Sequence, residues 1–157
     1  MPLWTRESIR LGTELPQRSR QWSRAIIAQR HSLVYGEDGI VDAPAPDQNL
    51  HTDDAAARRQ GLESAVGAAP QAIAQVHSVM MSAFGEGWIA GGKISVKMIK
   101  PLRPEDFTTA KGRIVGLSLE QTADSDEEVL RAECVVWVER RDHIKILVGT
   151  ASAIVRG

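Results

Sequence analysis

Hydrophobic residues recur at helical spacing in two parts of the first half of the chain. The stronger pattern covers residues 70–84, where Pro70 stands at a favourable first helical position. A second helix is expected over residues 24–35, with Ser23 as its N-cap and Gly36 at its end. The apolar stripe of the 70–84 segment consists of Ile73, Val76, Met80 and Phe84. We therefore expect this segment to form a buried central helix.

After a group of glycines around Trp88, the hydrophobic pattern changes to a period of two. Apolar and polar residues alternate over residues 93–98, and further apolar runs follow, separated by polar or proline-containing turns. These runs cover about residues 109–119, 129–139 and 143–155. Helices followed by antiparallel strands are typical of an α+β fold, so the sequence predicts one α+β domain over residues 1–157.

A long loop is expected between the first helix and the central helix. Residues 37–49 combine glycine and two prolines with Asp and Asn, a composition that favours turns and not a regular element. Loops of this length in a compact domain are usually binding or active-site loops, or flexible. Thr52 or Asp53 then begins a short helix that ends at Gly61.

Composition narrows the functional classes. Hydrophobic residues make up 43% of the chain and charged residues 25%, values typical of soluble globular proteins, and the net charge is −1. There is no basic surplus for nucleic acid, no apolar segment long enough for a membrane span and no secretory signal, so we expect a cytoplasmic protein. Cys134 lies in an apolar run and is interpreted as buried filler, and the histidines lack the spacing of metal ligands.

Three segments in the same order resemble the MaoC-like dehydratases and (R)-specific enoyl-CoA hydratases. DQNLHTDDAAARRQGL is similar to the histidine signature of this family, and KISVKMIKPLRPEDF is similar to its strand and turn, with Pro101 and Asp106 at matching places. VGTASAIV is similar to its closing strand. The match to the signature is carried by Asn49, His51, Asp53, Ala57 and Gly61. The resemblance covers about residues 20–157.

The resemblance implies a hot-dog fold, a curved antiparallel sheet wrapped around a central helix, assembled here as a homodimer. It also implies a hydro-lyase that hydrates an enoyl thioester or dehydrates a 3-hydroxyacyl thioester of coenzyme A or acyl-carrier protein, without metal or redox cofactor. In this family a His and an Asp act on one water. His51 matches the histidine, and Asn49 of the same signature is expected to contact the substrate. The oxyanion donors are backbone N–H groups near the start of the central helix, which points to Gly67, Ala68 and Gln71.

The aspartate departs from the family pattern. The family residue lies five positions before the histidine, where this chain has Pro46, while Asp47 lies four before it. We expect Asp47 to be the catalytic partner. The alternative is Asp38, with residues 39–45 as an insertion. This departure keeps another hot-dog role open, such as a thioesterase, a tailoring enzyme or a protein that binds acyl thioesters without turnover.

Several side chains admit both a functional and a structural interpretation. Without the signature, His51 would be a loop histidine that caps the short helix or is exposed. Trp88 would line an acyl pocket or be part of the core, and His77 is expected to pack at the edge of the apolar stripe. A cluster of basic residues would either bind phosphates of the carrier or form a solvent-exposed face of a strand. It consists of Lys93, Lys97, Lys100 and Arg103.

Overall fold

The structure consists of one open sheet and four helices in the described part of the chain. The computed structural model describes residues 4–35, 49–121 and 128–156. The strands are β1 (Arg18–Gln21), β2 (Lys93–Met98), β3 (Phe107–Gln121), β4 (Glu128–Arg140) and β5 (Lys145–Val155). They form a single sheet in the order β1-β3-β4-β5-β2, and each pair of neighbours is antiparallel.

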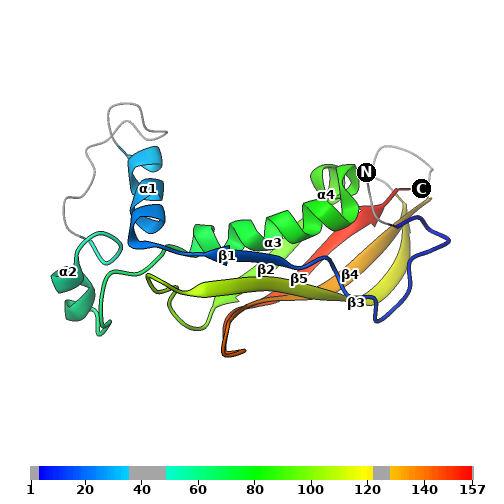
Figure 1. The fold of residues 1–157 in the computed structure, drawn as a ribbon. Helices are drawn as coiled ribbons and strands as arrows, with labels where there is room; N and C mark the ends of the chain where they lie inside the picture. Colours follow the sequence, from blue (N-terminus) through cyan, green and yellow to red (C-terminus); the bar gives the residue numbers. More distant parts are fainter. Residues whose placement is uncertain (1–3, 36–48, 122–127, 157) are drawn as a thin grey trace.

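The sheet curves around the central helix α3 (Ala69–Phe84), as Figure 1 shows. The inner side of α3 is fully buried at Val76, Val79 and Met80. It meets alternate residues of the strands, such as Ile114 and Val138, which are also fully buried. Burial of each such side chain contributes about 1.5–3 kcal/mol. The core is therefore the layer between α3 and the inner face of the sheet, which is the predicted α+β arrangement.

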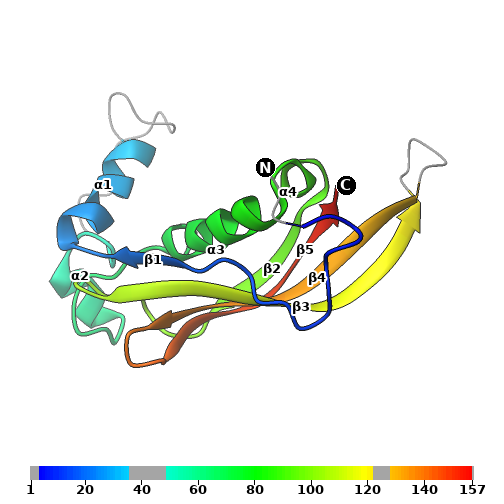
Figure 2. The same ribbon diagram turned by 45° about the vertical axis from the view of Figure 1, so that its right-hand side comes forward.

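Three smaller helices lie at the ends of α3. The helices α1 (Arg24–Val34) and α2 (Asp54–Arg59) flank its start, and α4 (Glu86–Gly91) follows its end (Figure 2). Ser23 caps α1 as predicted, because its Oγ accepts the N–H of Ile26 at 3.1 Å. Asp53 caps α2 in the same way, with Ala56 N–H as the donor at 2.6 Å. Separate short helices thus lie at both ends of α3, and the sheet and α3 extend between them.

Most predicted elements are confirmed, but two were missed. Neither the strand β1 nor the helix α4 was expected, while the central helix and the four later strands occur within a few residues of their predicted bounds. The predicted loop over 37–49 lies almost wholly outside the described residues. Cys134 is buried, as predicted, and its burial raises the pKa of the thiol to about 12. No helix in the described ranges is both long and apolar enough to cross a membrane.

Candidate active site

His51 lies on a short turn that Asn49 organises. The Oδ1 atom of Asn49 accepts the backbone N–H of His51 at 2.8 Å, which is the hydrogen bond of an Asx turn. The carbonyl of Asn49 also accepts the N–H groups of Thr52 at 3.1 Å and Asp53 at 2.9 Å. Asn49, predicted to contact the substrate, therefore holds the backbone at His51.

The imidazole of His51 is oriented by one backbone carbonyl. Its Nδ1 lies 2.9 Å from the oxygen of Val66, and the side chain is half-buried. A carbonyl oxygen only accepts hydrogen bonds, so Nδ1 must carry the proton. In the neutral ring Nε2 then carries the lone pair, and no described residue donates a hydrogen bond to it. His51 thus presents a proton acceptor on its outer nitrogen, and it does not cap α2 because Asp53 does.

The carbonyl that orients His51 belongs to a segment held by two hydrogen bonds to the histidine loop and α2. The N–H of Val66 donates to the carbonyl of Leu50 at 3.0 Å, and the N–H of Ala65 donates to Asp54 Oδ1 at 2.8 Å. Asp54 also pairs with Arg24 at 2.9 Å. The hydrogen bonds from Arg24 and then from Ala65 lower the pKa of Asp54. The ion pair therefore connects α1 and α2 to the strand-like segment behind the imidazole.

Gly67 follows Val66, leads into α3, and lies very close to Leu102. The N–H of Gly67 donates to the carbonyl of Leu102 at 2.7 Å. A Cβ atom on residue 67 would lie 2.6 Å from Leu102 Cδ2, so this close approach requires glycine. The histidine loop and the start of α3 are in this way joined to the turn that follows β2.

The three amides predicted as oxyanion donors are already used within the chain. Gly67 donates to Leu102, Ala68 donates to Gln71 Oε1 at 2.9 Å, and Gln71 donates to the carbonyl of Ala68 at 3.0 Å. The N–H of Ala69, the first residue of α3, has no acceptor among the described residues, and Ala69 is exposed. The available donor at this helix start is therefore Ala69, which was not among the three predicted donors.

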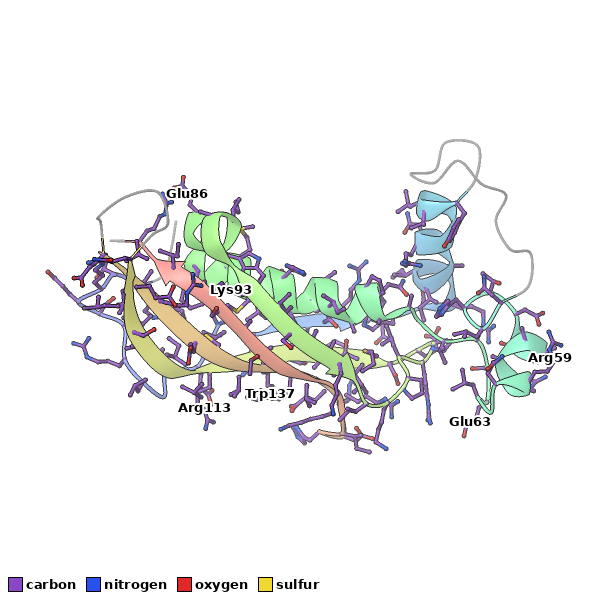
Figure 3. All side chains as sticks on the ribbon, turned by 180° about the vertical axis from the view of Figure 1, so that it is seen from behind. Arg59, Glu63, Glu86, Lys93, Arg113 and Trp137 are labelled. Carbon is purple, nitrogen blue, oxygen red and sulfur yellow. The ribbon has the colours of Figure 1, made fainter. Side chains whose placement is uncertain are left out.

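Trp88 lies far from His51. It is buried on α4, beyond the end of α3, whereas Val66 and His51 lie just before its start. Sixteen residues of helix separate the two places by about 24 Å. Figure 3 shows this separation through Glu86 on α4 and Arg59 on α2, at opposite ends of the molecule. Within one chain, Trp88 is a core residue and does not share a pocket with His51.

His77 also belongs to the α4 end. His77 is exposed, and its ring lies 5.3 Å, between centroids, from that of Trp88 in a tilted contact. The expected packing at the edge of the stripe is therefore a contact with a tryptophan. Asp47 and Asp38, the two candidates for the catalytic carboxylate, lie outside the described residues. Within the described ranges, no three His, Cys, Asp or Glu side chains come together as a metal site would require.

Solved structures show which fold this is. The chain is similar to a MaoC-like dehydratase from Rhodospirillum rubrum, with a TM-score of 0.71, 14% identity, and 98% of this chain and 97% of that one covered. It is similar to an (R)-hydratase from A. caviae involved in PHA biosynthesis, with a TM-score of 0.65, 16% identity, and 93% and 96% covered. The ChsH1-ChsH2 complex of Mycobacterium tuberculosis is a third, with a TM-score of 0.63, 14% identity, and 92% and 95% covered. No protein-family model and no curated protein matches the sequence.

These similarities define the structural class of the chain. It has the hot-dog fold of the MaoC-like dehydratases and (R)-hydratases, and the resemblance inferred from its three sequence segments is confirmed at the level of the fold. The identities are low, so chemistry has to be argued from the chain's own residues.

Proposed function

We propose that the protein is a hydro-lyase that adds water to a trans-2-enoyl thioester or removes it from a 3-hydroxyacyl thioester. The observation that supports this most is the His51 imidazole, whose Nδ1–H is held by Val66 while Nε2 is left as a proton acceptor. A backbone N–H without an acceptor among the described residues belongs to Ala69 at the start of α3. A base and an amide donor at one end of one helix are two of the three groups that this chemistry needs from the protein, the third being an acid.

In the hydration direction, His51 Nε2 takes a proton from a water as its oxygen attacks carbon 3 of the enoyl thioester. Negative charge develops on the thioester oxygen, where the N–H of Ala69 stabilises it. A carboxylic acid then protonates carbon 2, and we assign this role to Asp47, with Asp38 as the alternative. Asp47 is preferred because it shares a short loop with His51, whereas Asp38 reaches the site only if residues 39–45 loop out.

The substrate carrier and the assembly belong to the same proposal. We assign the thioester to coenzyme A or an acyl-carrier protein and the active form to a homodimer. Support comes from proteins of this fold, which include an (R)-hydratase and a complex of two chains. No metal or redox cofactor takes part in the proposed steps.

A product assay tests the reaction class. Purified protein is mixed with a series of trans-2-enoyl-CoA thioesters, while the absorbance of the conjugated thioester and the release of free thiol are followed together. A hydratase removes the enoyl absorbance without releasing thiol. Release of thiol would establish a thioesterase instead, and the absence of both signals over the series would contradict catalysis on these substrates.

The choice between the two aspartates has its own test. Asp47→Asn keeps the shape of the side chain but removes the proton it would deliver, so hydration should fall by about a hundredfold or more. Asp38→Asn should leave the rate near that of the unmodified protein. The reverse result would establish the insertion alignment, and normal activity in both variants would remove the Asp and His pair from the mechanism.

A further inference from the structure

A groove opens beside the start of α3, away from the core. It lies between α1, β1 and the outer side of α3 and has a volume of about 440 Å³. Small-molecule sites commonly have volumes of about 300–1,000 Å³. Residues from all three elements line it, among them Arg20, Trp22, Ile26, Arg30, Pro70 and Gln71. The groove is therefore large enough for a substantial part of a ligand.

One end of the groove lies beside the start of α3, next to the candidate site. Pro70 and Gln71 line it, and they directly follow Ala69, whose N–H is free. Along α3 the lining continues as far as Ser78, a distance of about 12 Å. A thioester whose carbonyl lies at Ala69 can thus extend one of its two arms through the groove, away from His51.

The charges in the groove have one sign. Arg20 and Arg30 both line it, and no acidic side chain is among its described lining residues. The Arg20 guanidinium lies 4.8 Å from the centre of the Trp22 ring, and Arg30 is half-buried. Neither guanidinium has a carboxylate partner in the described part of the chain, in contrast to Arg24, which pairs with Asp54.

We propose that this groove binds an anionic group on the thioester substrate through Arg20 and Arg30. Guanidinium groups suit such a role because they bind carboxylates and phosphates through paired hydrogen bonds and keep their charge at all physiological pH values. The anion is either a carboxylate at the far end of the acyl group or a phosphate of the carrier. This inference rests on the proposed function, and it adds a substrate class, thioesters with a second anionic group placed away from the reacting bond.

The test compares three enoyl thioesters that differ in the anionic groups they carry. They are crotonyl-CoA, the crotonyl thioester of uncharged pantetheine, and an enoyl-CoA with a terminal carboxylate. Arg30→Met and Arg20→Met should each raise KM about tenfold for a thioester that carries the recognised anion, with kcat unchanged. An effect on both CoA thioesters that is absent for pantetheine identifies a carrier phosphate, and an effect limited to the dicarboxylic substrate identifies the acyl carboxylate.

Arg141→Met is the matched control. Its guanidinium also lies on an aromatic ring, 4.6 Å from the centre of Phe107, but at the β4–β5 turn and outside the groove. If the groove variants change KM no more than Arg141→Met does for any of the three substrates, the proposal is wrong.

Calorimetric titration with crotonyl-CoA and with the dicarboxylic enoyl-CoA separates this proposal from the proposed reaction. Should the protein bind either thioester without hydrating it, a tenfold weaker affinity of the Arg30→Met variant would support the groove although the hydratase had failed. Equal affinities, or no binding of either thioester to the unmodified protein, would overturn the groove proposal.

Discussion

At the scale of single residues, His51, the proposed base, contributes little to the packing. Its ring is half-buried and held by one hydrogen bond to Val66, so His51→Ala should fold normally. The rate of hydration should fall by about a hundredfold or more, because the variant lacks the base. Steady-state kinetics and thermal unfolding of both proteins measure the two effects.

The control for His51 is His143→Asn. His143 is exposed and has a φ of 64°, a conformation that Asn tolerates well, and it lies in the β4–β5 turn. It should keep full activity. If His51→Ala remains close to the unmodified rate, the histidine only shapes its loop.

We expect Asn49 to act on the proposed reaction through His51, as a positioning residue. Asn49→Ala removes the acceptor of the His51 N–H, a hydrogen bond worth about 1 kcal/mol, so kcat should fall about fivefold. Asn49→Asp keeps an acceptor oxygen at this place and should restore most of kcat. If Asn49→Ala acted only through a general loss of stability, its melting temperature would fall, and Asn49→Asp would not restore kcat. Equal losses of kcat in the two variants would contradict the positioning role.

At the scale of elements, Glu139 joins β3, β4 and the β4–β5 turn. Its carboxylate accepts hydrogen bonds from Lys111 on β3 at 2.5 Å and from Trp137 on β4 at 2.9 Å, and lies 3.1 Å from His143 in the β4–β5 turn. Burial favours the neutral acid, but these three donors outweigh it and hold the pKa of Glu139 at about 2, below its usual 4.5. Figure 3 shows Trp137 on the face of the sheet opposite α3.

This lowered pKa predicts how stability depends on pH. The carboxylate binds its proton more weakly in the folded chain, so its stabilisation is complete above pH 4.5 and is lost as pH falls toward about 2. Glu139→Gln should reduce the free energy of unfolding by about 1–2 kcal/mol near pH 7, and this difference should shrink as pH falls below 4.5. Chemical denaturation at the two ends of this range measures it.

Glu133→Gln is the control for Glu139, because Glu133 lies on the same strand but is exposed. It should change the free energy of unfolding by less than about 0.5 kcal/mol at either pH. A penalty for Glu139→Gln that stays constant down to pH 2 would show that the amide is disfavoured for its shape and not for its missing charge.

The elements also show what could be predicted from the sequence. Periodicity was sufficient for α3 and for the four later strands, since each buries one face against the other layer. The strand β1 was missed because all four of its residues are exposed, and it exists only through pairing with β3. The helix α4 was missed because the glycines at 87 and 91 indicate a break; in the structure they allow close contact with Ile154.

The candidate site, too, could be predicted only where its signal is local in the sequence. The signature identified His51, but no pattern indicated that Nδ1 would bond to Val66, 15 residues away. The helix start was located correctly, but the Gly67 amide pairs with Leu102 from a distant segment, and no local pattern indicated that this donor would already be used. Local spacing therefore indicated the candidate residues, and contacts between elements determine which of their groups are available.

At the scale of the whole molecule, the sheet is open, and one of its margins is formed by β2. The strand β2 pairs with β5 on one side only, and its other edge has no strand beside it among the described residues. The helix α4 leads into β2 and exposes 72% of Ile89. An open strand edge beside an exposed apolar side chain is a surface that a second copy of the chain would cover.

We therefore expect a homodimer that buries this margin, and sedimentation at micromolar concentration should show about twice the mass of one chain. Ile89→Lys places a charge beside β2 and should shift the protein toward monomers without unfolding it, since the side chain is already exposed in one chain. Leu119→Lys is the matched control, because Leu119 is 61% exposed on β3, which two strands separate from β2. A monomer with full activity would contradict the dimer, and dissociation by Leu119→Lys alone would place the interface on the other margin.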